Sequence, residues 1–93
     1  MVVSRWRPVA GHEADFEALG SQARTRMRLV DGVDMIEAFK SGGEVVVVAG
    51  YSDADAYRRI VEDEKGPFAT IASEVGIEQA GEWLSSERGQ TLG

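Results

Sequence analysis

The chain has 93 residues, of which 43% are hydrophobic and 28% are charged, with no cysteine and a formal net charge of −6 at pH 7. These values predict a single globular domain over residues 1–93, disfavour nucleic-acid binding by so acidic a chain, and exclude disulfides, thiolate metal sites and cysteine nucleophiles. Without a signal-like N-terminus or an apolar run long enough to span a bilayer, the protein is expected to be cytoplasmic, with no membrane contact.

The N-terminal segment, residues 2–8, predicts a strand because its side chains alternate between two faces. Ser4 and Trp6 fall on one of these faces, and Arg5 and Arg7 fall on the other. The two arginines could anchor an acidic ligand, but we expect ion pairs instead, because opposite charges commonly pair between neighbouring strands. The candidate partners are Glu37 and Glu82.

Residues 12–29 predict a helix, because apolar residues recur every three or four positions and form one stripe. The stripe consists of Phe16, Leu19, Ala23, Met27 and Val30. Near the end of the helix, Arg24, Arg26 and Arg28 are spaced by two residues and therefore do not share a face. We interpret them as a solvated helix end, which Asp31-Gly32 terminates.

Two further strands are expected over residues 33–39 and 44–51, joined by a hairpin turn at Ser41-Gly42-Gly43, where glycine can adopt positive φ. The second of these strands contains the uninterrupted run Val45–Val48. Such a run is typical of a central strand that is buried on both faces. A partner subunit could cover the second face.

The next helix is expected to begin at Ser52 as its N-cap, with Asp55 acting as the capping-box carboxylate. Gly66-Pro67 interrupts this helix, and proline suits the first position of the helical piece that follows. Gly76 ends that piece. The apolar stripe after the break consists of Phe68, Ile71, Ala72 and Val75.

A short last strand is predicted over residues 80–86, followed by a tail over residues 87–93. The resulting order is βαββαβ, which predicts an α+β, ferredoxin-like fold with a four-stranded antiparallel sheet and its helices on one face. Many unrelated functions share this fold, so the element order alone does not give the function.

Three local motifs resemble those of the antibiotic biosynthesis monooxygenase-like family. Val9–Phe16 resembles the joint between its first strand and helix, Tyr51–Tyr57 resembles the exit of its third strand, and Gly66-Pro67-Phe68 resembles the break in its second helix. In order and spacing, the resemblance spans residues 2–84. It implies a homodimer whose sheets pack into a dimeric α/β barrel, with a pocket between sheet and helices in each subunit.

Members of this family differ in activity: some oxidise aromatic, polyketide-like substrates without metal or flavin, some degrade heme, and many have no known activity. The heme-degrading branch has an Asn, a Trp and a His where this chain has Ser4, Tyr51 and Ala72. Heme degradation is therefore not expected, and the resemblance implies neither a cofactor nor a metal.

The predicted pocket residues are Ser4, Trp6, Tyr51 and Trp83. Aromatic walls with a few polar groups suit a flat aromatic ligand, although the same residues could simply fill the core or a dimer interface. His12, the single histidine, is interpreted as a solvated residue of the first helical turn rather than as a base or metal ligand. No residue is predicted to be catalytic.

The favoured function is therefore a cofactor-independent, monooxygenase-like homodimer that acts on a small aromatic or polyketide-like molecule. The alternative is a non-catalytic dimer of the same fold that binds a small ligand or is associated with stress. An RNA-recognition module is disfavoured because the acidic chain has Val45–Val48 where such modules expose aromatic residues. Acylphosphatase-like hydrolysis is disfavoured because Pro8–His12 contains no arginine-bearing phosphate loop.

Overall fold

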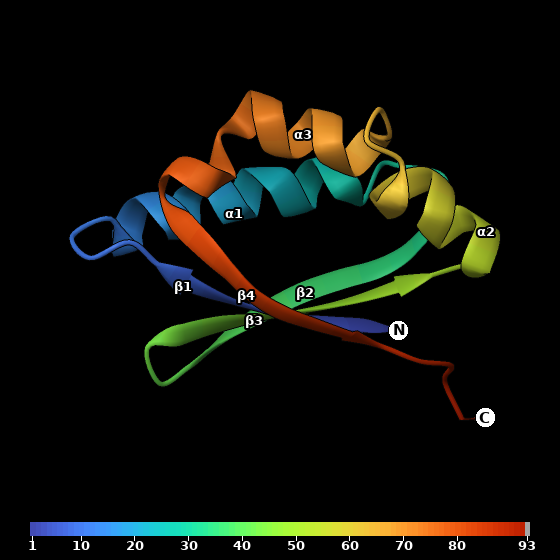
Figure 1. Ribbon diagram of the computed structural model, residues 1–93, viewed down its shortest axis with the longest axis horizontal. Helices are drawn as coiled ribbons and strands as arrows, with labels where there is room; N and C mark the ends of the chain where they lie inside the picture. Colours follow the sequence, from blue (N-terminus) through green and yellow to red (C-terminus); the bar gives the residue numbers. More distant parts are fainter. Residues whose placement is uncertain (93) are drawn as a thin grey trace.

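The computed structural model describes residues 1–92 and shows one antiparallel sheet with its helices on one face (Figure 1). The strands pair in the order β2-β3-β1-β4. This arrangement confirms the predicted ferredoxin-like βαββαβ fold. The elements are β1 (Val2–Pro8), α1 (Glu13–Met27), β2 (Val33–Ser41), β3 (Glu44–Tyr51), α2 (Ala54–Tyr57), a π-helical segment (Arg58–Glu62), α3 (Pro67–Val75), a 3₁₀ turn (Ile77–Gln79) and β4 (Gly81–Arg88).

Helix α1 is two residues shorter at its C-terminal end than its apolar stripe predicts. It ends at Met27, which is buried, whereas Leu29 is 85% exposed. The chain turns away because Gly32 adopts a φ of +100°, which brings its backbone against Ala56 and Ile60. The end of α1 is thus determined by a tertiary contact.

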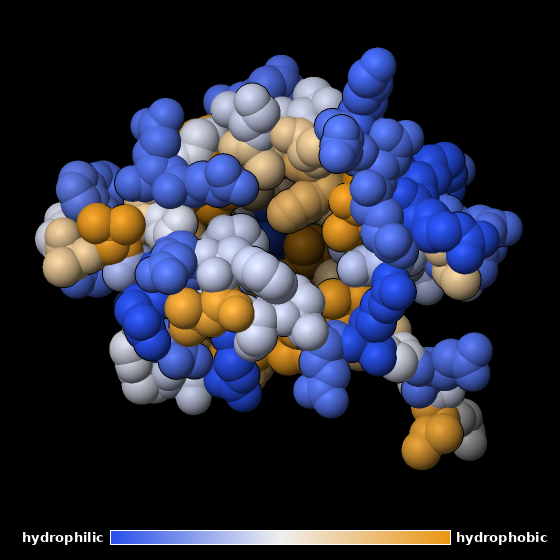
Figure 2. Space-filling model, viewed as in Figure 1, coloured by the Kyte–Doolittle hydropathy of each residue, from blue (hydrophilic) through white to orange (hydrophobic). Residues whose placement is uncertain are grey.

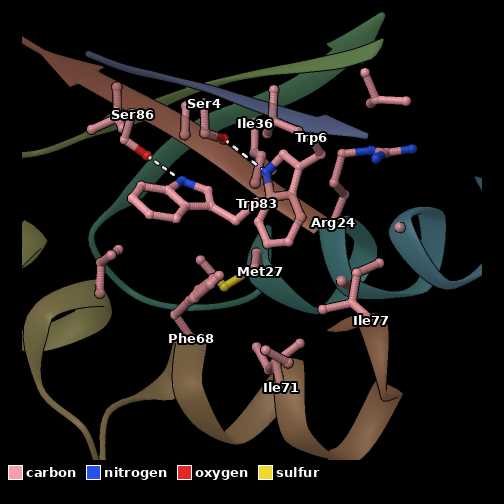
Figure 3. A pocket seen from close by; sticks show the side chains of 18 of the residues that line it. Ser4, Trp6, Arg24, Met27, Ile36, Phe68, Ile71, Ile77, Trp83 and Ser86 are labelled. Atoms are coloured by element: carbon pink, nitrogen blue, oxygen red, sulfur yellow. Dashed lines mark hydrogen bonds between the residues drawn. The ribbon is translucent and has the colours of Figure 1, made fainter. Parts of the chain in front are cut away.

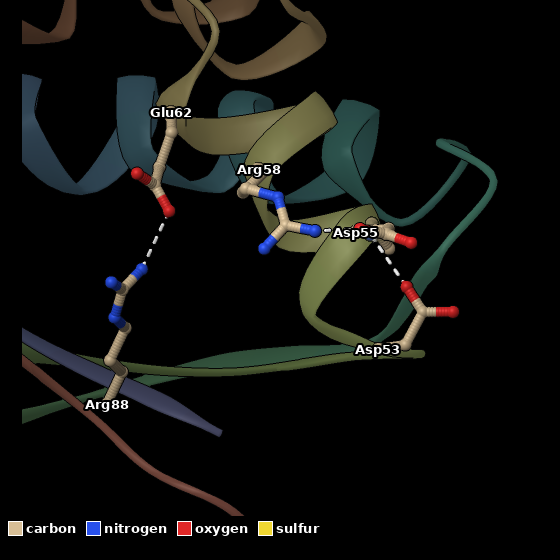
Figure 4. Close-up of polar contacts among 6 residues, drawn as sticks. Asp53, Asp55, Arg58, Glu62 and Arg88 are labelled. Carbon is tan, nitrogen blue, oxygen red and sulfur yellow. Dashed lines mark hydrogen bonds and ion pairs between the residues drawn. The ribbon is translucent and has the colours of Figure 1, made fainter.

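The cap of α2 lies one residue later than predicted. Asp53 is extended, and its side chain accepts a hydrogen bond of 2.7 Å from the backbone N–H of Ala56. Ser52, the predicted cap, instead donates to Asp34 on β2 at 2.9 Å. Asp55, the predicted capping-box residue, pairs with Arg58 (Figure 4). A carboxylate next to the first helical residue thus replaces the hydroxyl that could have capped it.

The predicted break at Gly66-Pro67 is confirmed. A Cβ at Gly66 would lie 2.5 Å from the carbonyl oxygen of Arg59, so the close approach of the two helical pieces requires glycine. Pro67 then begins α3, and Gly76 ends it in the left-handed conformation.

Arg5 and Arg7 form ion pairs as expected, but with another partner. Both reach Glu44, at 3.5 Å and 3.9 Å. The strand order explains this, because β1 pairs with β3 and not with β2, which carries Glu37. Glu82 lies opposite Arg7 on β4, and within residues 1–92 it has no arginine within 4.0 Å.

Strand β4 is longer than predicted, since Glu87 and Arg88 pair with Val3 and Val2 of β1. The first residues of the predicted tail thus belong to the sheet. Gly93, its last residue, lies outside the described residues.

The two faces of β3 differ in what covers them. Val45 and Ala49 face the helices and are buried in the core. Val46 points to the opposite face, where Arg5 and Phe39 flank it in register, and it is only 2% exposed. Phe39 itself is 55% exposed. Val46 is therefore buried on the face of β3 that the helices leave uncovered, as Val45 and Ala49 are on the other face. The predicted barrel with a second subunit stays a prediction.

Candidate ligand-binding cavity

A cavity of about 540 Å³ lies between the sheet and the helices. Its volume falls within the range of small-molecule sites, roughly 300–1,000 Å³. Most of its wall is apolar, and Met27, Phe68 and Ile71 form the helical side (Figure 3). Figure 2 shows the opening as a hollow with apolar atoms inside, between α3 and β4. Such an enclosure suits a largely apolar molecule.

The four residues predicted from the sequence all line this cavity. Ser4 and Trp6 come from β1, Tyr51 from the end of β3, and Trp83 from β4. The structure thus brings together side chains that are up to 79 positions apart in the sequence (4 to 83). Their role in binding a ligand stays a prediction. His12 is not among the lining residues and pairs with Asp15 at 3.1 Å on the surface.

The two indole N–H groups are already bonded within the protein. Trp6 Nε1 donates to Ser4 Oγ at 3.1 Å, and Trp83 Nε1 donates to Ser86 Oγ at 2.9 Å (Figure 3). These bonds fix the indoles and leave their apolar rings for contact with a ligand. Trp6 also packs against Phe16, with ring centroids 6.1 Å apart. Trp83 is 56% exposed and therefore lies where a bound molecule could cover it.

The sequence analysis missed Ser86 because of an irregularity in β4. In a regular strand, residues three apart point to opposite faces. The register between β1 and β4 shifts between Arg5 and Trp6, so that Trp6 is opposite Trp83 and Arg5 is opposite Ser85. The extra residue of this bulge, Leu84, puts Trp83 and Ser86 on the same face.

Tyr51 contributes a phenol that stays protonated at neutral pH. Burial raises the pKa of Tyr51 to about 12, and the neighbouring Tyr57 contributes to the shift. The two rings meet edge to face, with centroids 5.4 Å apart. A neutral phenol can donate a hydrogen bond to an oxygen of a ligand.

An ion pair lies beside Tyr57 and connects two elements across the cavity. Arg88 on β4 donates to Glu62 of the π-helical segment at 2.8 Å, and its guanidinium lies 4.8 Å from the ring centre of Tyr57 (Figure 4). The hydrogen bond to Glu62 raises the pKa of Arg88 above its ordinary value. Glu62 and Tyr57 both line the cavity.

Arg24 also lines the cavity, contrary to the solvated position that we expected from the sequence. Arg26 and Arg28 do lie on the surface and pair with Glu74 and Glu37, at 2.7 Å and 3.4 Å. Burial lowers the pKa of Arg24, and the nearby Arg28 acts in the same direction. The spacing of Arg24 in the sequence could have indicated this position, because it lies four residues after Gly20 and three before Met27, and both of these are buried.

Within residues 1–92, no group of three or more His, Asp or Glu residues is placed to hold a metal ion. The carboxylates that line the cavity are Glu62 and Glu78. Over the same residues, no helix has the length and apolarity of a membrane span.

No protein-family model and no curated protein sequence matches the chain. Solved structures share its fold, among them proteins from three different organisms. SnoaB, a cofactor-independent oxygenase from Streptomyces nogalater, superposes with a TM-score of 0.73 at 16% identity, over 98% of this chain and 92% of that one. Rv0793 from Mycobacterium tuberculosis superposes with a TM-score of 0.68 at 20% identity, over 98% of this chain and 94% of that one.

The third structure, a Deinococcus radiodurans protein assigned as an antibiotic biosynthesis monooxygenase, gives a TM-score of 0.65 at 15% identity. The match covers 100% of this chain and 97% of the other. All three matches span nearly the whole chain, so they concern the complete βαββαβ arrangement. The chain therefore has the fold of the antibiotic biosynthesis monooxygenase-like proteins, as its sequence motifs predict.

Proposed function

We propose that this protein is a cofactor-independent, monooxygenase-like protein that takes a small, flat aromatic or polyketide-like molecule into its cavity. The observation that carries the proposal is an apolar cavity of about 540 Å³ with Trp6 and Trp83 in its wall. The fold shared with SnoaB, itself a cofactor-independent oxygenase, supports the same kind of chemistry.

The proposed reaction takes a substrate with an acidic CH₂ group, or with a phenolic O–H beside a ring C–H, because in a cofactor-independent reaction the substrate itself supplies the electrons. Loss of a proton gives an enolate or phenolate, which passes electrons to dioxygen. For a methylene group the balance is CH₂ + O₂ → C=O + H₂O: one oxygen atom enters the substrate, and the other leaves as water. Both C–H bonds break, and all four electrons come from the substrate carbon.

The residues of the cavity suit the binding part of this reaction. The Tyr51 phenol can donate to the enolate or phenolate oxygen, and the Ser4 hydroxyl can donate while its oxygen accepts from Trp6. The apolar wall excludes water that would otherwise protonate the anion, and hydrogen bonds to the anionic oxygen offset the cost of burying the charge. The proposal assigns no residue as the base.

We further propose that the protein acts as a homodimer through the face of the sheet that its helices leave uncovered (Figure 1). Phe39 is 55% exposed there, beside the buried Val46. Size-exclusion chromatography with light scattering is expected to give twice the 10.1 kDa mass of the chain. Phe39→Asp is expected to give the monomer, whereas Leu29→Asp, at another exposed apolar position, leaves the dimer intact.

The cavity is tested with 1,4-dihydroxynaphthalene as the probe. Under nitrogen, quenching of tryptophan fluorescence is expected to report saturable binding, which Trp83→Ala weakens about tenfold through loss of the ring contact. Leu29→Ala, a change at an exposed residue that does not line the cavity, leaves binding unchanged.

Admission of oxygen then separates the two candidate functions. Oxygen uptake above the rate without protein, lowered by Trp83→Ala and with one atom of ¹⁸O₂ entering the product, supports a monooxygenase, whereas uptake that yields only the quinone and H₂O₂ does not. Saturable binding without uptake favours the non-catalytic, ligand-binding alternative. Absence of binding by this quinol and by other flat aromatic probes would falsify the proposed use of the cavity.

A further inference from the structure

We propose that Arg24 makes the cavity selective for flat aromatic ligands that carry an anionic oxygen group, such as a carboxylate or a phenolate. The inference rests on the proposed function, because it assumes that the cavity binds an aromatic molecule. It adds the charge of that molecule and a residue that recognises it.

The first observation is the position of the side chain. Arg24 lies on α1 between the buried residues Gly20 and Met27, and Figure 3 shows it among the side chains that surround the cavity. A Cβ placed at Gly20 would lie 3.1 Å from Arg24 Nη1 and 3.9 Å from Ile77 Cδ1. The missing side chain at Gly20 therefore leaves the space in which the guanidinium lies, although glycine within a helix is less stable than alanine.

The second observation is that Arg24 has no carboxylate partner in the described part of the chain. Most other arginines have one within 4.0 Å, and these are Arg5, Arg7, Arg26, Arg28, Arg58 and Arg88. Arg59, which also lacks one, reaches the carbonyl oxygen of Asp31 instead. Over residues 1–92, the Arg24 guanidinium donates no hydrogen bond to a protein acceptor, unlike those of Arg26, Arg28 and Arg59, so its N–H donors are not engaged within the described protein.

The third observation is the electrostatic setting. Burial lowers the pKa of Arg24, Arg28 lowers it further, and Glu37 offsets part of this effect. A guanidinium nevertheless keeps its charge at neutral pH. A cation that is partly removed from water and lacks a counter-ion interacts more strongly with an anion than a fully solvated cation does.

Neither of the two carboxylates that line the cavity serves as the anionic partner of Arg24. Glu62 is engaged by Arg88 at 2.8 Å, and Glu78 is exposed and lies more than 4.0 Å from the charged atoms of Arg24. An anionic oxygen at Arg24 can form two parallel hydrogen bonds with the guanidinium, while the aromatic body contacts Trp6. Arg24 is thus proposed as a specificity-determining residue.

The test compares two probes of the same shape and different charge: 2-naphthoate, an anion at neutral pH, and 2-naphthamide, its neutral isostere. Affinity is measured by calorimetry with the 93-residue chain. We expect the wild type to bind 2-naphthoate at least about tenfold more tightly, with a preference that falls as salt is added. Arg24→Gln should abolish the preference and leave the affinity for 2-naphthamide within about twofold, which also shows that the cavity is intact.

Two further variants complete the design. Arg24→Lys keeps the charge but not the planar fork, and is expected to retain part of the preference. Arg26→Gln removes a surface arginine of the same helix and is expected to leave both affinities unchanged.

The failures of the two proposals can be told apart. An equal loss of affinity for both probes in Arg24→Gln would show that Arg24 only shapes the cavity. An unchanged preference for 2-naphthoate would show that Arg24 does not contact the anion. Either result overturns the role of Arg24 and leaves the proposed function standing. If the wild type binds neither probe, the proposed function fails, and this inference fails with it.

Discussion

The two ends of the cavity are closed by different physical means. Strand β4 runs along the cavity from one end to the other. Near Gly81, where β4 begins, lies the end of the cavity that we call the Phe16 end. It is closed by buried apolar side chains, with Phe16 only 4% exposed beside Ile77. Where β4 finishes, the Tyr57 end is closed by the Tyr57 ring and the exposed ion pair between Arg88 and Glu62.

This difference indicates which end of the cavity stabilises the fold and which end moves when a ligand enters. Burial of one large apolar side chain contributes roughly 1.5–3 kcal/mol, whereas an exposed ion pair contributes about 0–1 kcal/mol. We therefore expect the Phe16 end to hold the fold together, and the Tyr57 end to move so that the opening between α3 and β4 widens for a ligand. The predictions below test this division, beginning with the largest effect.

Phe16→Ala is expected to lower the free energy of unfolding by about 3–5 kcal/mol, because it removes a buried ring and leaves a cavity between α1 and the sheet. Such a loss is a large part of the stability of a small domain. Urea denaturation followed by circular dichroism measures it. A loss below about 1 kcal/mol would mean that the Phe16 end is not the rigid one.

Gly81→Ala at the same end is expected to cost about 1–3 kcal/mol by overpacking. An added Cβ at Gly81 would overlap the Phe16 ring, so the ring or β4 must move. Gly89→Ala is the matched control, since a Cβ there meets nothing within 4 Å. In the Phe16→Ala background the cost of Gly81→Ala should largely disappear, and its persistence would contradict this explanation.

Tyr51 gives a pH dependence at the Tyr57 end. Its pKa rises from 10.0 to about 12 on folding, chiefly through burial. The unfolded chain therefore loses this proton first, and stability falls as the pH rises from 10 towards 12. Because the side chain is only partly buried, we expect a loss of about 1 kcal/mol. Urea denaturation at several alkaline pH values should show a smaller decline for Tyr51→Phe than for the wild type, and equal declines would refute the assignment.

The elements could be predicted from the sequence because they depend on local periodicity. Alternation in residues 2–8 placed Ser4 and Trp6 on one face, and a spacing of three and four gave the apolar stripe of α1. The glycines at turns marked where elements end. These signals need no knowledge of which elements become neighbours.

The features that were missed depend on tertiary contacts. Glu44 as the partner of Arg5 and Arg7 follows from the strand order, and Ser86 follows from a register shift between β1 and β4. Arg24 was expected in solvent because its spacing of two from Arg26 indicates a different helix face. Its position is instead determined by Gly20, one helical turn away, which leaves space for the guanidinium. A partner subunit is the predicted cover of the second face of the sheet, so the barrel stays a prediction.

The smallest effect on stability is expected for Glu62→Gln, which breaks the ion pair with Arg88 at the Tyr57 end. Since both side chains are exposed, the free energy of unfolding should change by less than about 1 kcal/mol, and less still in high salt. The same change removes a link between β4 and the π-helical segment, so stopped-flow fluorescence should show faster association and dissociation of 1,4-dihydroxynaphthalene. Asp55→Asn, which breaks the exposed pair with Arg58 away from the cavity lining, should leave both rates unchanged. Unchanged rates in Glu62→Gln would show that a ligand enters through the hollow between α3 and β4 without movement of the Tyr57 end (Figure 2).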